Sequence, residues 1–335
     1  MWVPDWFGYK SRAAGQVGGA MAVDFNTVKF LLWAKNLGVN FTRTATLGHL
    51  GLNCLPRTLR RAVRDFGIPA TGEQISRCFL REPCKDVFAD EFLRFLGAGE
   101  VVSVDHSDFE GATFLHDLNE PFPENMPGRF DLVLDGGTLE HVFNYPAALK
   151  HSLELLRVGG HFITVTPANG AMGHGFYQFS PELFFGVFNA QNGFVLRKIV
   201  LFEAFKPDAP FYEVNNPAVV GRRVELSVSR PVYLAVLAQK TADVPILARP
   251  PQQSDYVAAW SRPGQTIDQS TALGRLRVTL NPYWPPWLRE WKARLTRRSE
   301  TATLDNQRSF RRLSRKAVAG ERQESTSISS ALEKK

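Results

Sequence analysis

Cysteine is scarce in this chain of 335 residues, and the three that are present, Cys54, Cys78 and Cys84, show no CxxC spacing. An odd number of cysteines without that spacing supports neither a disulfide framework nor a zinc site built on thiolates. The seven histidines are scattered and form no HxxxH or HExxH pair. The sequence therefore predicts buried free thiols and no metal site.

Long apolar runs are also absent. No window approaches the roughly 18 consecutive apolar residues that a membrane-spanning helix requires. The first ten residues, MWVPDWFGYK, are aromatic and charged, so they lack the basic-then-apolar order of a secretory signal. We therefore expect a cytoplasmic protein.

Most of the chain lacks an excess of positive charge, although the net charge is +7. Residues 286–335 contain 13 of the 40 basic and 6 of the 33 acidic side chains, which leaves 27 of each sign in the other 285 residues. A neutral body does not present the basic surface with which proteins follow a phosphate backbone. No nucleic-acid partner is expected.

What the chain does contain is a regular alternation of strand and helix patterns. With 44% hydrophobic positions it can bury one large core and still carry additional segments. We expect strands over residues 42–47, 101–104, 112–115, 130–134, 162–166, 194–202 and 233–238. This alternation predicts an α/β fold, with a doubly wound, mostly parallel seven-stranded sheet and helices on both faces.

Capping and breaking residues place helices between these strands. The pattern predicts a helix over residues 25–35 and another that begins around residues 144–146, where an Asn precedes an early Pro. Gly159 and Gly160 are expected to end that second helix. The pair Ser180-Pro181 predicts the start of a third.

Four regions follow from these patterns. Residues 1–40 are expected to form an N-terminal covering segment, and residues 41–242 the main domain. Residues 243–295 are a Pro-rich extension with a Trp-containing helix, and residues 296–335 form a basic, largely disordered tail. The helix carries Trp284, Trp287 and Trp291 among basic residues. It is interpreted either as a weak contact with a membrane surface or a protein, or as a helix packed on the main domain.

Three consecutive strands of the predicted sheet end in an acid, namely Asp105, Asp117 and Asp135. Ligands of open α/β sheets bind beyond the carboxyl ends of the strands. Carboxylates accept hydrogen bonds from ribose hydroxyls and from an exocyclic amine. A single Asp at such a position is a common turn residue, but three in succession favour a nucleoside-binding site.

The run FDLVLDGGTLEHVFNYPAALKHSLELLRVGGHFITVTP, residues 130–167, resembles the fourth to sixth motifs of class I S-adenosylmethionine-dependent methyltransferases, a Rossmann-like superfamily. These enzymes commonly place an acid and a Glu-His pair after the fourth strand and a Gly-Gly turn before the fifth. A weaker resemblance extends over residues 42–240. It implies S-adenosyl-L-methionine as cofactor and methyl transfer as the activity of residues 41–242.

The resemblance also implies roles for residues at the strand ends. By motif position, the cofactor would contact Gly48, Asp105, His106, Asp117, Leu118, Asp135 and Gly136. Asp105 would hold the ribose hydroxyls, and Asp117 with the backbone at Leu118 would meet the adenine. Asp135 and Gly136 would border the methionine part.

The segment after the first strand departs from the family pattern. Class I enzymes usually have an acid and a GxGxG loop there, whereas this chain has TATLGHLGLN, with Gly48 and Gly51. Glycine lets the backbone approach a ligand closely, and Gly48 is the better candidate. The loop also fails to supply the GxGxxG turn of a nicotinamide-dependent dehydrogenase. It leaves open a second interpretation, a catalytically silent cofactor-binding module that acts as a scaffold or partner protein.

Candidate residues for the methyl acceptor follow the fourth and fifth strands. His141 lies six residues after Asp135, and an imidazole with a pKa of about 6.5 suits proton removal at neutral pH. A histidine bonded to a helix start is the alternative. Glu140 precedes it, and His174 and Tyr177 lie in the segment PANGAMGHGFYQFSP, a composition typical of a substrate wall. The expected reaction is methyl transfer to an oxygen or nitrogen of a small-molecule or glycan acceptor.

Overall fold

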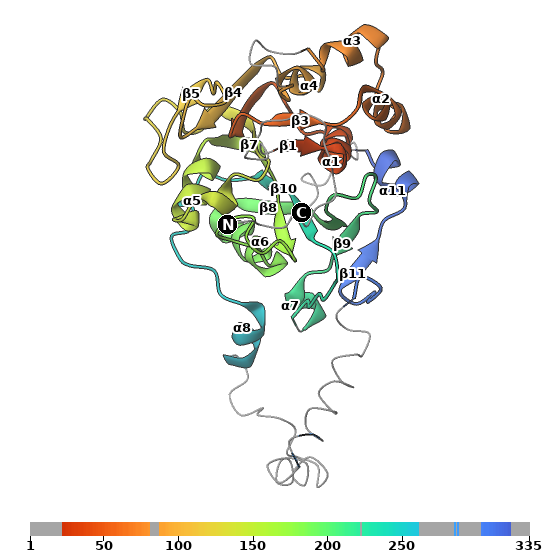
Figure 1. The fold of residues 1–335 in the computed structure, drawn as a ribbon. Helices are drawn as coiled ribbons and strands as arrows, with labels where there is room; N and C mark the ends of the chain where they lie inside the picture. Colours follow the sequence, from red (N-terminus) through yellow and green to blue (C-terminus); the bar gives the residue numbers. More distant parts are fainter. Residues whose placement is uncertain are drawn as a thin grey trace, which may run out of the picture.

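The computed structural model describes residues 22–80, 87–221, 223–260, 285, 287 and 303–322. Nine strands of these residues form one sheet, in the order β11-β9-β8-β10-β7-β6-β2-β4-β5 (Figure 1). Their bounds are β2 (Arg43–Leu47), β4 (Glu100–Asp105), β5 (Phe114–Leu115), β6 (Phe130–Asp135), β7 (Leu156–Asn169), β8 (Phe194–Glu203), β9 (Tyr212–Val214), β10 (Val232–Lys240) and β11 (Phe310–Arg312).

All seven strands expected from the sequence are present, and the doubly wound, mostly parallel sheet is confirmed. The five neighbours β5, β4, β2, β6 and β7 run parallel, whereas β10 runs antiparallel to both β7 and β8. The short strands β9 and β11 extend the sheet beyond β8. Numbered along the chain, the seven expected strands have the spatial order 3-2-1-4-5-7-6.

Helices cover both faces of the sheet. The helices are α1 (Phe25–Asn36), α2 (Pro56–Asp65), α3 (Gly72–Arg77), α4 (Asp90–Phe95), α5 (Tyr145–Glu154), α6 (Pro181–Val187), α7 (Pro217–Val220), α8 (Ser254–Trp260) and α11 (Arg315–Gly320), with 3-10 turns η1 (Leu139–His141) and η2 (Ala190–Asn192). Side chains of successive strand residues point to opposite faces. In β7, Ile163 packs in the core cluster that includes α1 to α4, whereas Phe162 packs in the cluster that includes α5 and α6.

The expected helix over residues 25–35 is α1. The carboxylate of Asp24 accepts a hydrogen bond from the Thr27 N–H at 2.8 Å, which caps its first turn. Nine of its 12 residues are buried, so α1 is part of the core. The residues just before it form β1 (Ala22–Asp24), which pairs with β3 (Gly51–Asn53) in a separate two-stranded sheet. Residues 1–21 of the predicted covering segment lie outside the described residues.

The Gly159-Gly160 pair does not end the preceding helix, as the sequence predicted, but lies inside a strand. Helix α5 already ends at Glu154, and β7 starts at Leu156, so both glycines lie inside the strand. Gly159 has a φ of 86°, and a Cβ at Gly160 would lie 2.9 Å from the Arg157 carbonyl oxygen. The register with β6 shifts between Phe130 and Leu132. The glycines therefore form an irregularity in the strand that only residues without a side chain accommodate.

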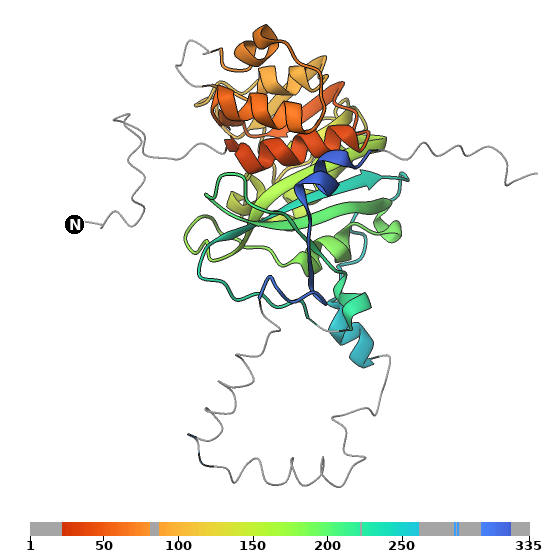
Figure 2. The ribbon, with the colours of Figure 1, turned by 90° about the vertical axis from the view of Figure 1, so that its right-hand side faces the viewer.

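Part of the tail expected to be disordered is folded. Residues 303–322 contribute β11 to the sheet and α11 to the surface of α1 (Figure 2). Phe310 is 1% exposed, and Glu321 accepts hydrogen bonds from the Trp33 indole at 3.1 Å and from Lys198 at 2.7 Å. Phe310 and Glu321 therefore attach this segment to the rest of the protein. The sequence pattern did not reveal them because Arg and Ser residues dominate the segment. Of the predicted Trp helix, Trp287 is exposed, and Trp284 and Trp291 lie outside the described residues.

Two of the cysteines are free thiols, as expected. Burial raises the pKa of Cys54 to about 12 and that of Cys78 to about 11. Cys84 lies outside the described residues. Among the helices that the structure describes, none has the length and apolarity needed to cross a membrane.

Phe310→Ala tests whether the C-terminal segment is part of the fold. Removing this buried ring leaves a cavity beside β9, so we expect the free energy of unfolding to fall by about 3–5 kcal/mol. Chemical denaturation measures the change. The control Lys316→Ala, at an exposed position of the same segment, should stay within about 0.5 kcal/mol. Equal stability of the two variants would show that the segment contributes nothing.

Candidate functional site

The candidate residues lie along the edge formed by the carboxyl ends of β5, β4, β2, β6 and β7, which we call the strand-end edge. These strands are neighbours in that order, and every site residue predicted from the sequence follows one of them. Adjacent strands are about 4.8 Å apart, so the edge from β4 to β7 spans roughly 14 Å. That is enough length for one extended ligand to contact several strand ends.

Gly48 ends β2 in a tight turn. It has a φ of 78°, in the region that favours glycine, and its N–H donates to the Val104 carbonyl at 2.6 Å. The chain then turns into β3, and Leu50 is buried. A Cβ at Gly136 would lie 2.9 Å from Leu50 Cδ1. The loop after β2 therefore packs directly against Gly136, which explains why position 136 carries no side chain.

Two of the predicted carboxylates are partly accessible at neighbouring strand ends. Asp105 ends β4 and is half-buried, and the adjacent His106 is exposed. Asp117 follows β5 and is also half-buried. Hydrogen bonds from the backbone and side chain of Asn119 hold the pKa of Asp117 below its usual value. Leu118, next to it, is buried. Asp105 and Asp117 thus lie at the carboxyl ends of two neighbouring strands, where solvent reaches both carboxylates.

Asp135 lies differently from the expectation that three carboxylates share one ligand. Its side chain is fully buried, and Oδ1 accepts hydrogen bonds from the backbone N–H groups of residues 137–139. Oδ2 accepts from the Thr164 hydroxyl at 2.7 Å. Burial, with the nearby negative charge of Glu140, raises the pKa of Asp135. Oδ1 holds the chain that leads into the turn η1 and Oδ2 ties the carboxylate to β7, so Asp135 positions that turn from within the protein.

Glu140, His141 and His174 come together, and we call them the histidine cluster. Their nearest ligand-type atoms all lie within 4.8 Å of one another. Glu140 is fully buried, and its Oε2 accepts a hydrogen bond from the Thr166 hydroxyl at 3.2 Å. Its Oε1 has no hydrogen-bond partner among the described residues and lies 3.6 Å from His174 Nε2. Both imidazoles are exposed, so the cluster is closed on the Glu140 side and open on the other.

The loop after β7 is fastened to the backbone of Glu140. The N–H groups of Phe176 and Tyr177 donate to the Glu140 carbonyl at 2.9 and 3.2 Å. A Cβ at Gly175 would lie 2.9 Å from that carbonyl oxygen and 3.2 Å from His141 Nδ1. Glycine is therefore required for the loop to approach so closely. The Tyr177 hydroxyl donates to the Phe143 carbonyl at 2.6 Å, so it supports the loop and does not reach the cluster.

Glu140 sets the electrostatics of the cluster. Its carboxylate, 3.6 Å from His174 Nε2, raises the pKa of His174. Burial, with the charge of Glu140, also raises the pKa of Tyr233 to about 12, and the Tyr233 hydroxyl lies 3.4 Å from His174 Nε2. A buried carboxylate beside an imidazole increases the proton affinity of the ring. The cluster can therefore accept a proton or hold a cation.

His49 is a residue of the edge that the sequence did not single out. Its ring stacks on Phe88 with centroids 3.6 Å apart, Nδ1 lies 2.6 Å from the Glu110 carbonyl and Nε2 lies 3.1 Å from Asp90. Burial lowers its pKa, but the bonds to Asp90 and Glu110 outweigh burial and raise it overall. His49 therefore ties the loop after β2 to the loop after β4. A lone histidine after a glycine carries no sequence signal for this role.

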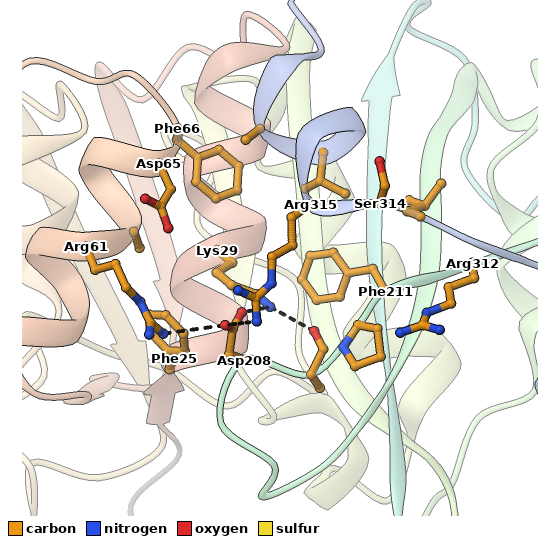
Figure 3. A pocket seen from close by; sticks show the side chains of 16 residues that line it. Phe25, Lys29, Arg61, Asp65, Phe66, Asp208, Phe211, Arg312, Ser314 and Arg315 are labelled. Atoms are coloured by element: carbon orange, nitrogen blue, oxygen red, sulfur yellow. Dashed lines mark hydrogen bonds and ion pairs between the residues drawn. The ribbon is translucent and has the colours of Figure 1, made fainter.

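A separate cavity of about 410 Å³ lies away from the strand-end edge, between α1, α2 and the C-terminal segment (Figure 3). Asp208 lies in its wall, with Lys29 at 3.0 Å, Arg61 at 3.5 Å and Arg315 in contact. Burial lowers the pKa of Lys29, although Asp208 opposes this. None of the predicted site residues lines the cavity. The ion pairs join α1 and α2 to the C-terminal segment.

The sheet defines the class of the fold. The order 3-2-1-4-5-7-6, with only the seventh strand antiparallel to its neighbours, is that of the class I methyltransferases. The position of the candidate residues agrees with that fold, because they follow the strands whose ends face the ligand in open α/β sheets. The chain thus has the class I methyltransferase fold that the run over residues 130–167 resembles.

No protein-family model and no curated protein sequence matches the chain. Among solved structures it is similar to the Burkholderia thailandensis 1,6-didemethyltoxoflavin-N1-methyltransferase, with 14% identity, 64% of this chain and 79% of that chain covered, and a TM-score of 0.34. It is also similar to a Mesorhizobium loti S-adenosylmethionine-dependent methyltransferase, with 17% identity, 62% and 95% covered, and a TM-score of 0.33. Similarity this low carries no argument about activity, ligand or acceptor.

The His49 bridge gives a pH-dependent contribution to stability. Because its pKa is raised in the folded state, the contribution should be complete below the unfolded pKa of about 6.5 and lost as pH rises through the folded pKa. At low pH we expect the free energy of unfolding of the wild type to exceed that of His49→Gln, which cannot titrate, by about 1 kcal/mol. Urea denaturation at a series of pH values measures the difference. A difference that stays constant across the series would contradict the bridge.

Proposed function

We propose that the protein is an S-adenosyl-L-methionine-dependent methyltransferase that acts on an oxygen or nitrogen of a small-molecule or glycan acceptor. One observation carries the proposal. The strand-end edge has accessible carboxylates at β4 and β5 and, about 14 Å away at β6 and β7, a buried carboxylate with two imidazoles. A nucleoside cofactor fits the first group, and an acceptor that must lose a proton fits the second.

On the cofactor side, we assign the ribose hydroxyls to Asp105 and the adenine to Asp117 with the backbone at Leu118. His106, exposed beside Asp105, borders the ribose. The turn at Gly48 lies between β4 and β6 and takes the methionine part, where a left-handed glycine lets the backbone come close. Asp135 acts indirectly by holding the turn next to Gly136, since its carboxylate is fully engaged inside the protein.

On the acceptor side, the histidine cluster binds the nucleophilic atom and draws off its proton. Bound S-adenosyl-L-methionine would supply an electrophilic methyl group for in-line attack by the acceptor, and S-adenosylhomocysteine would remain after the transfer. Such a displacement depends on alignment and on exclusion of water. Proton transfer by a positioned side chain contributes typically about 10²–10⁴-fold to the rate.

Asp105→Ala tests the cofactor side. Loss of a charged acceptor for the ribose should weaken S-adenosylhomocysteine binding about tenfold or more. Isothermal titration calorimetry measures it, with circular dichroism to verify the fold. Asp108→Ala, at an exposed position of the same loop, is the matched control and should bind as the wild type does. Unchanged affinity in folded Asp105→Ala would remove the ribose assignment.

Glu140→Gln tests the acceptor side. The substitution keeps the shape and removes the charge, so we expect kcat to fall by about 100-fold or more while cofactor affinity is retained. A methyl-transfer screen over hydroxyl and amine acceptors identifies the substrate on which this is measured. Glu124→Gln, exposed and distant in sequence, is the control. Binding of S-adenosylmethionine without turnover on any acceptor would favour a catalytically silent module.

A further inference from the structure

One carboxylate oxygen of Glu140 on the strand-end edge is buried without a hydrogen-bond partner among the described residues. Glu140 is 0% exposed, and Oε1 has no hydrogen bond within the described residues. A buried charged acceptor left without a donor costs free energy, so native structures keep very few of them. His174 Nε2 lies 3.6 Å from Oε1, beyond hydrogen-bond distance. The position of Oε1 therefore suits a bound cation between the two side chains.

The donors around this oxygen suit a transition metal. Two imidazole nitrogens and one carboxylate oxygen are a ligand set that zinc uses in catalytic sites. With metal–ligand bonds of 2.0–2.2 Å, tetrahedral ligand atoms are about 3.3 Å apart. Glu140 and His174 are already near that separation, and no pair in the histidine cluster exceeds 4.8 Å.

Groups around the histidine cluster hold its ligands in place. The Thr166 hydroxyl donates to Oε2 of Glu140 and leaves Oε1 facing the histidines. Gly175 permits the loop that carries His174 to lie against His141. Hydrogen-bonding partners of this kind orient metal ligands and strengthen binding.

We propose that Glu140, His141 and His174 bind one divalent transition-metal cation, with zinc as the best match to the donors. Because both imidazoles face solvent, the cation keeps an open coordination position. A hydroxyl, or a hydroxyl beside a carbonyl, is the acceptor chemistry that would fill it. This assignment of acceptor class rests on the proposed function, whereas the metal site does not.

Sequence reasoning predicted no metal site, because the third ligand lies on a different loop from the Glu-His pair. The competing account is an ion pair between Glu140 and a protonated His174, with no metal. That account predicts no stoichiometric cation binding. A metal site predicts that cation binding requires both the Glu140 carboxylate and the His174 imidazole.

The test is calorimetric titration of the full chain, stripped of metal by chelation, with zinc chloride. We expect one equivalent bound by the wild type. Glu140→Gln and His174→Ala should each weaken binding by at least about tenfold, since each removes one of three protein ligands. His116→Ala removes a histidine outside the histidine cluster and is the matched control, with unchanged affinity expected.

Cobalt substitution gives a second readout that does not depend on activity. Cobalt bound to nitrogen and oxygen donors shows visible d–d bands without the near-ultraviolet thiolate band. A thiolate band would instead assign the ion to Cys54 and Cys78 and overturn the proposal. So would zinc binding that is absent from the wild type or unchanged in both ligand variants.

A parallel titration with S-adenosylhomocysteine separates the two proposals. Cofactor binding without zinc binding would overturn the metal site and leave the methyltransferase proposal standing. Zinc binding without cofactor binding would support the site and count against methyl transfer.

Discussion

The buried carboxylate of Asp135 is the constraint on which the strand-end edge depends. It accepts three backbone N–H groups and one hydroxyl, so the chain after β6 must turn at once into η1. That turn fixes Glu140 and His141, and the Glu140 carbonyl in turn holds the loop that carries His174. One buried carboxylate thus fixes the conformation of two loops. The hydrogen bonds that it accepts offset the free-energy cost of its burial.

The edge is electrostatically asymmetric. At β4 and β5 the acids are partly exposed, and hydrogen bonds from Asn119 hold the pKa of Asp117 below its usual value. After β6 both acids are buried, and Glu140 contributes to raising the pKa of Asp135 and of His174. Solvated carboxylates suit neutral hydroxyl and amine donors, whereas buried ones favour a proton or a cation. The electrostatic difference between the two ends of the edge therefore follows from depth of burial.

The sheet could be predicted from the sequence because buried parallel strands are apolar runs that end in turn residues. Asp105 and Asp117 could be placed for the same reason, since an acid after a strand lies at its carboxyl end. Whether such an acid is exposed could not be predicted. Asp135 looks like the other two, and only the donors of η1 and Thr164 distinguish it.

The sequence did not predict the histidine cluster or the shortest strands, and long-range contacts account for much of this. The histidine cluster depends on the Glu140 carbonyl capturing the N–H groups of Phe176 and Tyr177, a contact without periodicity. Strands of three residues, such as β1, β3 and β11, are too short for an alternation to be detected. In β11 the buried Phe310 stands among arginines, so composition indicated disorder where the segment is folded.

The pairing of β11 with β9 has a practical consequence for protein engineering. A shortened version that stops after α8 would leave β9 as an open sheet margin, with free backbone donors and acceptors. It would also remove the hydrogen bonds that Trp33 and Lys198 donate to Glu321, and it would expose apolar surface on α1 to solvent. Removing residues 303–322 would therefore expose a sheet edge of the kind through which proteins associate.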